Sequence, residues 1–401
     1  MRLFLLLLIL TSYSFANILQ EAIDKASPYS TINLSNATYI GNITINKPLN
    51  IIGKDDNVII KGTSSGSVIK INSSNVTLKN LTITNSGDRM DKIDSAISIQ
   101  KALHVEINNC KLLNSLYGID MDMVSSSKIL NNDITSKNKD ISLRGNALKM
   151  YYSHNNLIQD NTIEYSRDVT LNYSNNNIFK NNTFKHNRFS THLSMSNKNK
   201  FIHNKYIYNS VSLMLMGAMD TNVTNNTIQS SNGASGIGIV IGKVSNLIFE
   251  HNVVKYNAKA IYIEGLEKRI GIKRYINYND IIYNGEALHF HASIKDNKIT
   301  HNNIYGNIDD VVKDSGSKFS NSNIVEYNYW DRYAGFDRDK DGIGDTPHSI
   351  YQYADQLWHY NHKVKFFYAS PIMTLMNFLA NLAPFIEPNL LLLDEKPIFK
   401  N

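Results

Sequence analysis

The sequence predicts an all-β fold, a right-handed single-stranded parallel β-helix, and three observations predict it. Asparagine followed closely by an apolar residue recurs from about residue 75 to residue 330. The recurrences lie 21 to 29 residues apart, which is the spacing of a solenoid repeat. The segments between them alternate, as in Ile97-Ser98-Ile99 and Val76-Thr77-Leu78, with the period of a strand and not of a helix.

The repeated asparagine indicates how the coils are joined. The repeats fall at Asn80, Asn109, Asn132, Asn161, Asn182, Asn204, Asn226, Asn252, Asn279, Asn303 and Asn328. A leucine-rich repeat is excluded, because no leucine recurs at several fixed places per turn. We expect one coil per repeat, with each side-chain amide hydrogen-bonded to the next coil. Coils stack about 4.8 Å apart, so a dozen coils predict a rod roughly 55–60 Å long.

The first sixteen residues have the pattern of a signal peptide. Arg2 precedes an apolar run from Leu3 to Leu10, and Ser14-Phe15-Ala16 fits a small-x-small cleavage site. The run is too short to span a membrane. We predict removal after Ala16 and export to the periplasm.

The β-helix with its amino-terminal cap is expected over residues 17–330. Residues 17–26 place apolar side chains at helical spacing, and Pro28 ends the helix. An open sheet edge at the end of a solenoid needs a cover, so this helix is predicted to be the cap.

The charge and the cysteine content of the chain limit which partners and covalent links we expect. The 401-residue chain carries a net charge of +6 without a dense basic run, so we predict no nucleic-acid partner. Cys110 is the single cysteine, and it is expected to pack as a small apolar residue.

Coils with a spacing of 22 residues can be aligned with one another. This alignment predicts an inward column of Val169, Leu171, Tyr173, Thr191, Leu193, Met195, Leu213, Leu215 and Gly217. Side chains alternate along a strand, so the intervening residues are predicted to point outward. They are Asp168, Thr170, Asn172, Ser190, His192, Ser194, Ser212, Met214 and Met216. The same reasoning turns Met121, Met123 and Met150 inward, and Asp120, Asp122 and Lys149 outward.

Two outward methionines beside an outward histidine indicate a metal. Thioether and imidazole ligands suit Cu(I), so His192, Met214 and Met216, with Met195 nearby, are a candidate copper site. The alternative is that the methionines pack under a loop or against a partner. His289 and His291, on the same face as Tyr262 and Glu264, are a second candidate metal patch.

Charged residues on that face leave an enzymatic alternative. Asp120 and Asp122, with Lys149 and Arg144 nearby, resemble the acid–base groups of a polysaccharide lyase or epimerase. The alternative is solvated charge on a sheet. The Asn-Thr-Asp, Gly-His-Gly and Asp-Pro-His-Glu patterns are absent, so no catalytic residue is predicted and we expect no enzyme. A structural surface β-helix is a third alternative.

A closing segment over residues 331–366 contains an acidic loop. Asp337, Asp339, Asp341, Ile343 and Asp345 occupy alternate positions, with Gly342 at the turn. Such a loop resembles the calcium loops of EF-hands and dockerins, so a structural Ca²⁺ is a candidate. The pattern departs at position 12, where His348 replaces the bidentate glutamate; the alternative is a hydrogen-bonded turn.

Residues 367–401 are predicted to be a partner-docking tail. Ser370-Pro371 is a favourable helix start, and an apolar stripe runs from Ile372 to Leu382. Leu390 to Leu393 is a second apolar run. The helix either packs on the last coil or docks a membrane partner, and the sequence favours docking.

Short motifs distributed along the chain resemble a known family. They are Leu19-Gln20-Glu21-Ala22-Ile23, Asn85-Ser86-Gly87, Arg144-Gly145-Asn146, Arg167-Asp168, Arg188 with His192-Leu193 and Met195, Ser370-Pro371 and Ala383-Pro384-Phe385. Together they resemble the NosD family, within the broader carbohydrate-binding and sugar-hydrolase (CASH) β-helices. The chain departs where Ala147-Leu148 replaces Gly-Ile and where His348 replaces an aromatic residue.

The resemblance implies an accessory role in the periplasm. Members act in denitrification with an ABC transporter permease and ATPase of the inner membrane and with a copper chaperone, and they help to build the copper-sulfur centre of nitrous oxide reductase. It implies a transient copper role for the His192 group and a contact of the tail helix with the permease. It assigns no catalytic residue.

Overall fold

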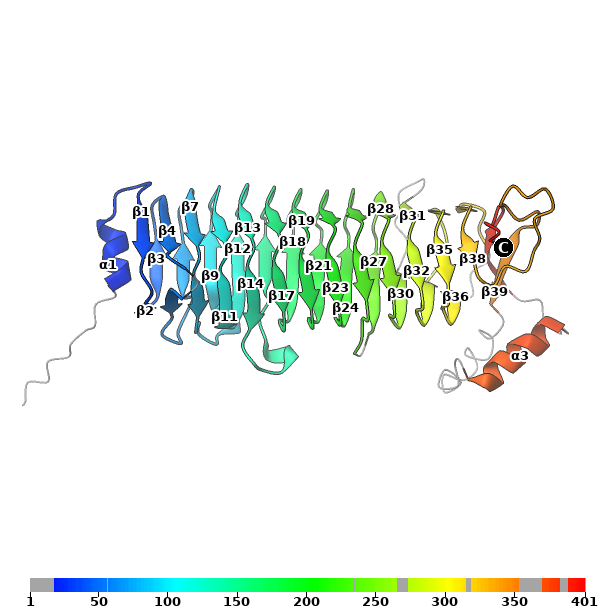
Figure 1. The fold of residues 1–401 in the computed structure, drawn as a ribbon, viewed down its shortest axis with the longest axis horizontal. Helices are drawn as coiled ribbons and strands as arrows, with labels where there is room; N and C mark the ends of the chain where they lie inside the picture. Colours follow the sequence, from blue (N-terminus) through cyan, green and yellow to red (C-terminus); the bar gives the residue numbers. More distant parts are fainter. Residues whose placement is uncertain are drawn as a thin grey trace, which may run out of the picture.

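The fold is a rod of stacked coils (Figure 1). The computed structural model describes residues 18–55, 57–233, 235–264, 273–314, 319–352, 370–382 and 389–400. Helix α1 (Ile18–Lys25) lies at one end and a closing segment at the other. The predicted signal peptide, residues 1–16, lies outside the described residues.

Each coil contributes strands to three parallel sheets, which we name A, B and C. Sheet A contains β1 (Thr31–Leu34), β4 (Leu49–Gly53), β7 (Val76–Lys79), β10 (Glu106–Asn108), β13 (Lys128–Leu130), β16 (Leu157–Gln159), β19 (Ile178–Lys180), β22 (Lys200–Ile202), β25 (Asn222–Thr224), β28 (Leu247–Glu250), β31 (Arg274–Asn277), β34 (Asn297–Thr300) and β37 (Ile324–Glu326). Sheet B contains β2 (Thr38–Ile40), β5 (Ile59–Lys61), β8 (Thr82–Thr84), β11 (Lys111–Ser115), β14 (Asp133–Ser136), β17 (Thr162–Glu164), β20 (Thr183–Lys185), β23 (Lys205–Ile207), β26 (Thr227–Gln229), β29 (Val253–Lys255), β32 (Asp280–Ile282), β35 (Asn303–Tyr305) and β38 (Tyr329–Trp330).

Sheet C is the one that carries the candidate metal residues. It contains β3 (Ile43–Ile45), β6 (Ile69–Ile71), β9 (Ser95–Gln100), β12 (Tyr117–Asp122), β15 (Leu148–Tyr151), β18 (Asp168–Asn172), β21 (Phe189–Ser194), β24 (Val211–Met216), β27 (Ile237–Gly242), β30 (Lys259–Glu264), β33 (Glu286–Phe290) and β36 (Asp309–Lys313). Short 3₁₀ turns η1 (Met90–Lys92) and η2 (Ile141–Leu143) precede β9 and β15. The predicted parallel β-helix is confirmed.

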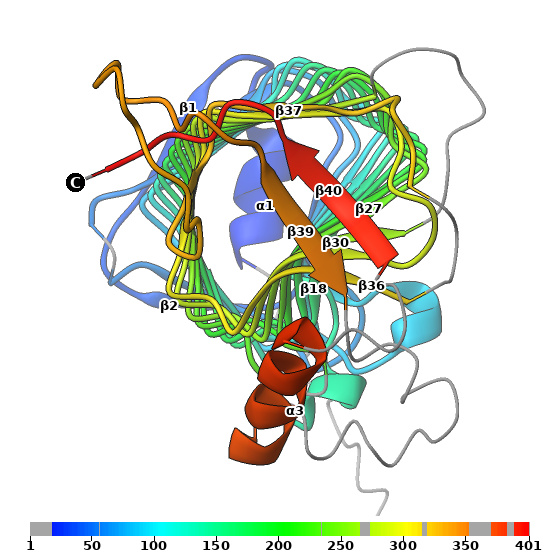
Figure 2. The same cartoon turned by 90° about the vertical axis from the view of Figure 1, so that its right-hand side faces the viewer.

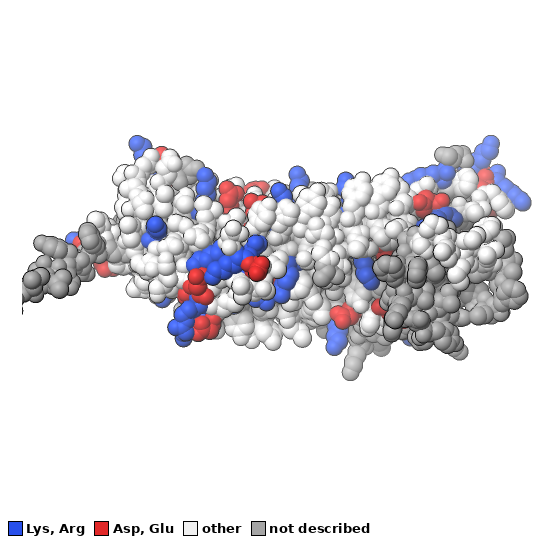
Figure 3. Space-filling model, turned by 90° about the horizontal axis from the view of Figure 1, so that it is seen from below, with Lys and Arg blue, Asp and Glu red and all other residues white. Residues whose placement is uncertain are grey.

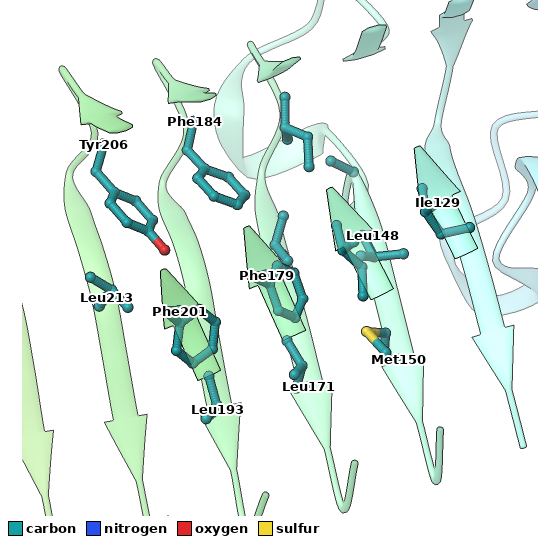
Figure 4. Close-up of a cluster of buried hydrophobic side chains, with 14 of the residues drawn as sticks. Ile129, Leu148, Met150, Leu171, Phe179, Phe184, Leu193, Phe201, Tyr206 and Leu213 are labelled. Carbon is teal, nitrogen blue, oxygen red and sulfur yellow. The ribbon is translucent and has the colours of Figure 1, made fainter. Parts of the chain in front are cut away.

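One apolar core runs the length of the rod, enclosed by the three sheets (Figure 2). Inward side chains stack on their equivalents one coil away, since equivalent residues are register partners (Figure 4). Phe179 stacks on Phe201 with 5.2 Å between ring centroids, and Phe184 on Tyr206 with 4.8 Å. Such stacking lets large side chains fill the core without voids. Met121 and Met150 are buried here as predicted, as is Cys110, where burial raises the thiol pKa to about 12.

The buried asparagine ladder is confirmed over most of its predicted length. At Asn132, Asn161, Asn182, Asn204, Asn226, Asn252, Asn279, Asn302 and Asn328, the side-chain oxygen of each later member accepts from the backbone N–H of the member before it. Three asparagines that were predicted to belong to the ladder do not belong to it. Asn80 and Asn109 have left-handed backbone conformations at the turn, with Leu81 and Cys110 buried next to them, and Asn303 lies one residue after the true member.

Residues at the corner between sheets C and A correct a second prediction. Met123, Tyr173 and Met195 were expected to point inward, but they are exposed and have φ values of 55°, 51° and 48°. Each follows directly after the last residue of a strand, so the strand alternation no longer applies. The left-handed conformation turns the chain, and the side chain faces solvent.

Both ends of the rod are covered. Leu19 and Ile23 of α1 are buried against the first coils, as predicted for the cap. At the other end β39 (His348–Gln352) pairs antiparallel with β40 (Asn389–Asp394) across the open core (Figure 2). The run from Leu390 to Leu393 is therefore part of the cover and not of a free tail, because Leu391 and Leu392 are buried.

The position of His348 predicts a pH-dependent loss of stability. Its ring lies 5.5 Å from the Trp330 ring and 5.6 Å from the Tyr333 ring, and burial lowers its pKa to about 4. Because the unfolded histidine binds a proton at about pH 6.5, the unfolded state gains protons first as pH falls. The contribution of neutral His348 to the free energy of unfolding is fully present above about pH 6.5. It is lost as the pH falls towards 4, and the loss is about 2 kcal/mol after allowance for partial exposure.

The substitution His348→Phe should remove this part of the pH dependence. The measurement is urea unfolding of wild type and variant at pH 7.5 and pH 5.0, with the exposed His203→Phe as a matched control. An equal loss of stability in wild type and His348→Phe would contradict the prediction.

Candidate functional site on the outer face of sheet C

His192 and Met214 are neighbours on adjacent coils. They are register partners in strands β21 and β24, so their backbones lie about 4.8 Å apart. Both side chains are half-buried and face outward, as predicted. The register thus places an imidazole and a thioether on neighbouring strands at the middle of sheet C.

Met195 and Met216 form the second pair of this site. Their backbones are linked by a hydrogen bond from Met195 N–H to the Met216 carbonyl, 3.0 Å long. Each thioether lies over a glycine of the following coil, Met195 over Gly217 and Met216 over Gly242. A Cβ at either glycine would stand within 3 Å of the sulfur, so the absent side chains leave the space that the thioethers occupy. We name His192, Met195, Met214 and Met216 the methionine patch.

The surroundings of His192 keep its imidazole neutral. Burial lowers its pKa, and the positive charge of Arg188 lowers it further, against the opposing effect of Asp168. Arg188 is itself held by Asp168, with contacts of 2.9 Å from Nε and 2.5 Å from the terminal nitrogen. Phe189 contacts the His192 ring edge-on at 5.7 Å between centroids. A neutral imidazole is the form that binds a metal ion.

Three residues that were predicted to point outward are buried. Asp168, Ser190 and Ser212 are buried. β21 has one more residue than β18 between the pairs Asp168–Phe189 and Thr170–His192, so a bulge interrupts the alternation at this point. Asp168 is covered by Arg188, and Phe189 lies beside His192; neither contact is predicted from the sequence.

The charged residues of the enzymatic alternative do not form one cluster. Asp120 alternates with the inward Ile119 and Met121, but it is buried by its 3.0 Å contact with Lys149. Arg144 instead donates to the Lys139 carbonyl at 2.7 Å. Lys137 and Lys139 both pair with Asp88. Figure 3 shows basic side chains gathered next to acidic ones on the lower face, towards the α1 end. Asp120 is thus a buried, ion-paired carboxylate, which fits neither an acid–base cluster nor the alternative of solvated charge.

The second predicted patch lies three to four coils further along the same face. His289 is buried and His291 is exposed, and both approach the Asp314 carboxylate. Asp314 was missed because the strand pattern ends at Lys313, although it lies one coil beyond His291 in register. Lys259 and Glu286, also missed, contact His289.

The acidic loop brings together three of its five predicted ligands. Carboxylate oxygens of Asp337, Asp339 and Asp341 lie within 4.8 Å of one another, the one such acidic or histidine group found among the described residues. Asp345 instead accepts from the Arg338 N–H at 2.8 Å, and Ile343 N–H donates to Asp341. His348 lies beyond the loop, in β39. Calcium binding here stays a prediction.

Helix α3 (Pro371–Leu382) starts where the Ser370-Pro371 pair predicts. Its exposed apolar side chains are Ile372, Leu375, Met376, Phe378 and Leu379. The helix lies below the rod, near its closing end (Figures 1 and 2). Within the described ranges the structure contains no helix with the length and apolar character needed to cross a membrane.

Comparison with known families settles the relationship of this chain. Residues 130–335, just over half of the chain, match the family described as periplasmic copper-binding protein (NosD). The chain belongs to the NosD family. The matched range includes the whole methionine patch. The right-handed β-helix family matches residues 30–171, which confirms the predicted hand.

Individual relatives agree with this assignment. The NosD-family chain is 24% identical over 385 residues to the probable ABC transporter binding protein NosD of Pseudomonas aeruginosa, covering 88% of this chain and 85% of that protein. Among solved structures, it resembles the A-module of mannuronan C-5 epimerase AlgE6 from Azotobacter vinelandii, with a TM-score of 0.60 and 12% identity over 78% of this chain and 93% of that one. A mannuronic acid specific family 6 lyase from human gut microbiota matches with a TM-score of 0.52 and 14% identity over 78% and 84%. Likeness at this identity shows the β-helix fold alone.

Proposed function

We propose that this NosD-family protein is a periplasmic accessory protein in the maturation of the copper-sulfur centre of nitrous oxide reductase. In this role it receives Cu(I) from a copper chaperone at the methionine patch and acts with the permease and ATPase of an ABC transporter. The observation that carries the proposal is the register pairing of His192 with Met214 beside Met195 and Met216. It performs no catalysis of its own.

The residues of the methionine patch fit a soft, monovalent copper ion. Thioether sulfur and neutral imidazole nitrogen are the donors that Cu(I) prefers over harder ions. The lowered pKa of His192 leaves its nitrogen unprotonated at a pH where a free histidine would be partly charged. Partial exposure leaves the site open to a docking partner, and a site with one imidazole and thioethers releases copper more readily than a thiolate site.

The transporter partner is supported by the relative from Pseudomonas aeruginosa, which is named as a probable ABC transporter binding protein. We assign the contact to helix α3, since its twelve residues include no charged side chain and its exposed face is apolar. Copurification with the permease should be lost in the variant Leu375→Asp with Phe378→Asp. Unchanged copurification would reject α3 as the contact, while leaving the copper proposal open to its own test.

The copper proposal predicts saturable Cu(I) binding by the mature protein. The measurement is an anaerobic titration against a chromophoric Cu(I) chelator of known affinity. His192→Ala and Met214→Ala should each weaken binding by about tenfold or more, the loss typical of removing a metal ligand. His203→Ala and Met123→Ala, exposed residues of the same types outside the patch, are the matched controls.

No binding by the wild-type protein, or equal binding by all four variants, would refute the methionine patch as a copper site. A polysaccharide lyase or epimerase would instead show turnover of an acidic polysaccharide, which we expect to be absent.

A further inference from the structure

A cluster of metal-ligating side chains closes sheet C near its carboxyl-terminal end. It is built by strands β30, β33 and β36, which are neighbours in the sheet. His289 is the register partner of Tyr262, and His291 and Asp314 follow the register pair Phe290 and Lys313. The coil spacing therefore places these side chains on one outer face.

His289 is held as a metal ligand would be held. Its side chain is 3% exposed, and its Nδ1 atom contacts the Glu286 carboxylate and lies 3.0 Å from Lys259 Nζ. A carboxylate on one ring nitrogen orients a histidine and directs the other nitrogen to a metal. The Nε2 atom is buried and lies 3.0 Å from an Asp314 oxygen without the geometry of a hydrogen bond.

Asp314 joins the two histidines. The same Oδ2 atom lies 3.0 Å from His289 Nε2 and 3.1 Å from His291 Nδ1. The two nitrogens thus face one carboxylate from different sides. The His291 side chain is 55% exposed, so its ring can turn towards His289 when a cation enters between them.

Carboxylates and the ammonium group of Lys259 surround this cluster. Burial raises the pKa of Tyr262, and the carboxylates of Asp314, Glu264 and Glu286 raise it further. Burial also acts to raise the pKa of Asp314, but contacts with His289 and His291 and the charge of Lys259 leave it below its usual value. Asp314 therefore offers one carboxylate oxygen to both histidines.

We propose that His289, His291 and Asp314 form a second metal site, which binds a divalent transition-metal cation, Cu(II) or Zn(II), through two imidazole nitrogens and one carboxylate oxygen. These donors suit borderline divalent ions, whereas the thioethers of the methionine patch suit Cu(I). The inference does not rest on the proposed function, because it uses other residues and another oxidation state.

The test is a titration of the mature protein with copper(II) chloride under air, followed by electron paramagnetic resonance. We expect one equivalent to bind with the signal of a nitrogen and oxygen site, and Zn(II) to displace it. His291→Ala and Asp314→Asn should each raise Kd by about tenfold or more, and Glu286→Gln should raise it by about tenfold. His301→Ala, an exposed histidine at another corner, is the matched control.

Three results would overturn the proposal: no binding by wild type, an unchanged Kd in both His291→Ala and Asp314→Asn, or equal loss in the His301→Ala control. Unfolding curves of His291→Ala and Asp314→Asn should match wild type, since both residues lie at the rim. The variant His192→Ala with Met214→Ala should retain the Cu(II) signal. Loss of that signal there would assign it to the methionine patch and overturn the second site.

Discussion

Replacing Asn182 by alanine should destabilise the rod by about 3–5 kcal/mol. Asn182 is fully buried in the asparagine ladder. Its oxygen accepts from the backbone and side-chain nitrogens of Asn161, at 3.0 and 2.9 Å, and its amide donates to the Ile158 carbonyl at 2.8 Å and to Asn204 at 3.0 Å. Alanine leaves these buried partners unpaired, at about 1–3 kcal/mol for each group, and opens a cavity beside them.

The measurement for Asn182→Ala is urea unfolding followed by far-ultraviolet circular dichroism. Asn172→Ala is the matched control, because Asn172 is half-buried on the outer face of the neighbouring coil, and it should change stability by less than about 1 kcal/mol. A solenoid is stabilised by contacts between neighbouring coils, so an interruption in the middle should also split the transition in two. Similar stabilities of the two variants would show that the ladder contributes little.

Replacing Asp394 by alanine should destabilise the closing end by about 3–5 kcal/mol. Asp394 is fully buried, and its Oδ2 accepts from Asn328 Nδ2 and Trp330 Nε1, each at 2.9 Å, and from the Asn328 N–H at 3.2 Å. It therefore takes the place of the next asparagine after the last coil. Alanine would leave three buried donors without their acceptor, and each carries a desolvation cost.

The loss at Asp394 should appear as early unfolding of the last coils. Hydrogen exchange of residues 324–330 and 389–394 is the direct measurement. Asp394→Asn should be milder, since its oxygen can still accept from Asn328 and Trp330. The adjacent and exposed Glu395→Ala is the control and should behave as wild type. Wild-type exchange in Asp394→Ala would show that β40 does not hold the end of the rod.

The proposed copper binding and the stability of the rod depend on the same coil register. The outer face of sheet C can present pairs such as His192 and Met214 because the inward side chains and the asparagine ladder fix the register of successive coils. A ligand pair set by backbone pairing is more rigid than one carried on loops. Variants of the ladder near Asn204 should therefore weaken Cu(I) binding as well as stability.

The sequence by itself determined the repeating part of this protein. The coil period, the inward column at Leu171, Leu193 and Leu215, and the pairing of His192 with Met214 all follow from strand alternation and a constant 22-residue spacing. Buried asparagines could be predicted because each coil needs one side-chain amide to hydrogen-bond the backbone groups of the neighbouring coil's turn. Such regularities repeat along the chain at short range, so a single sequence is enough to predict them.

Only the tertiary structure decided where the regularity stops. The exposure of Met195 depends on where β21 ends, and the burial of Ser190 depends on a bulge set by pairing with β18. Asp314 reaches His289 and His291 only through coil stacking, and Asp394 reaches Trp330 from 64 residues away. Such contacts join distant segments by pairing and packing, and no periodicity along the chain records them.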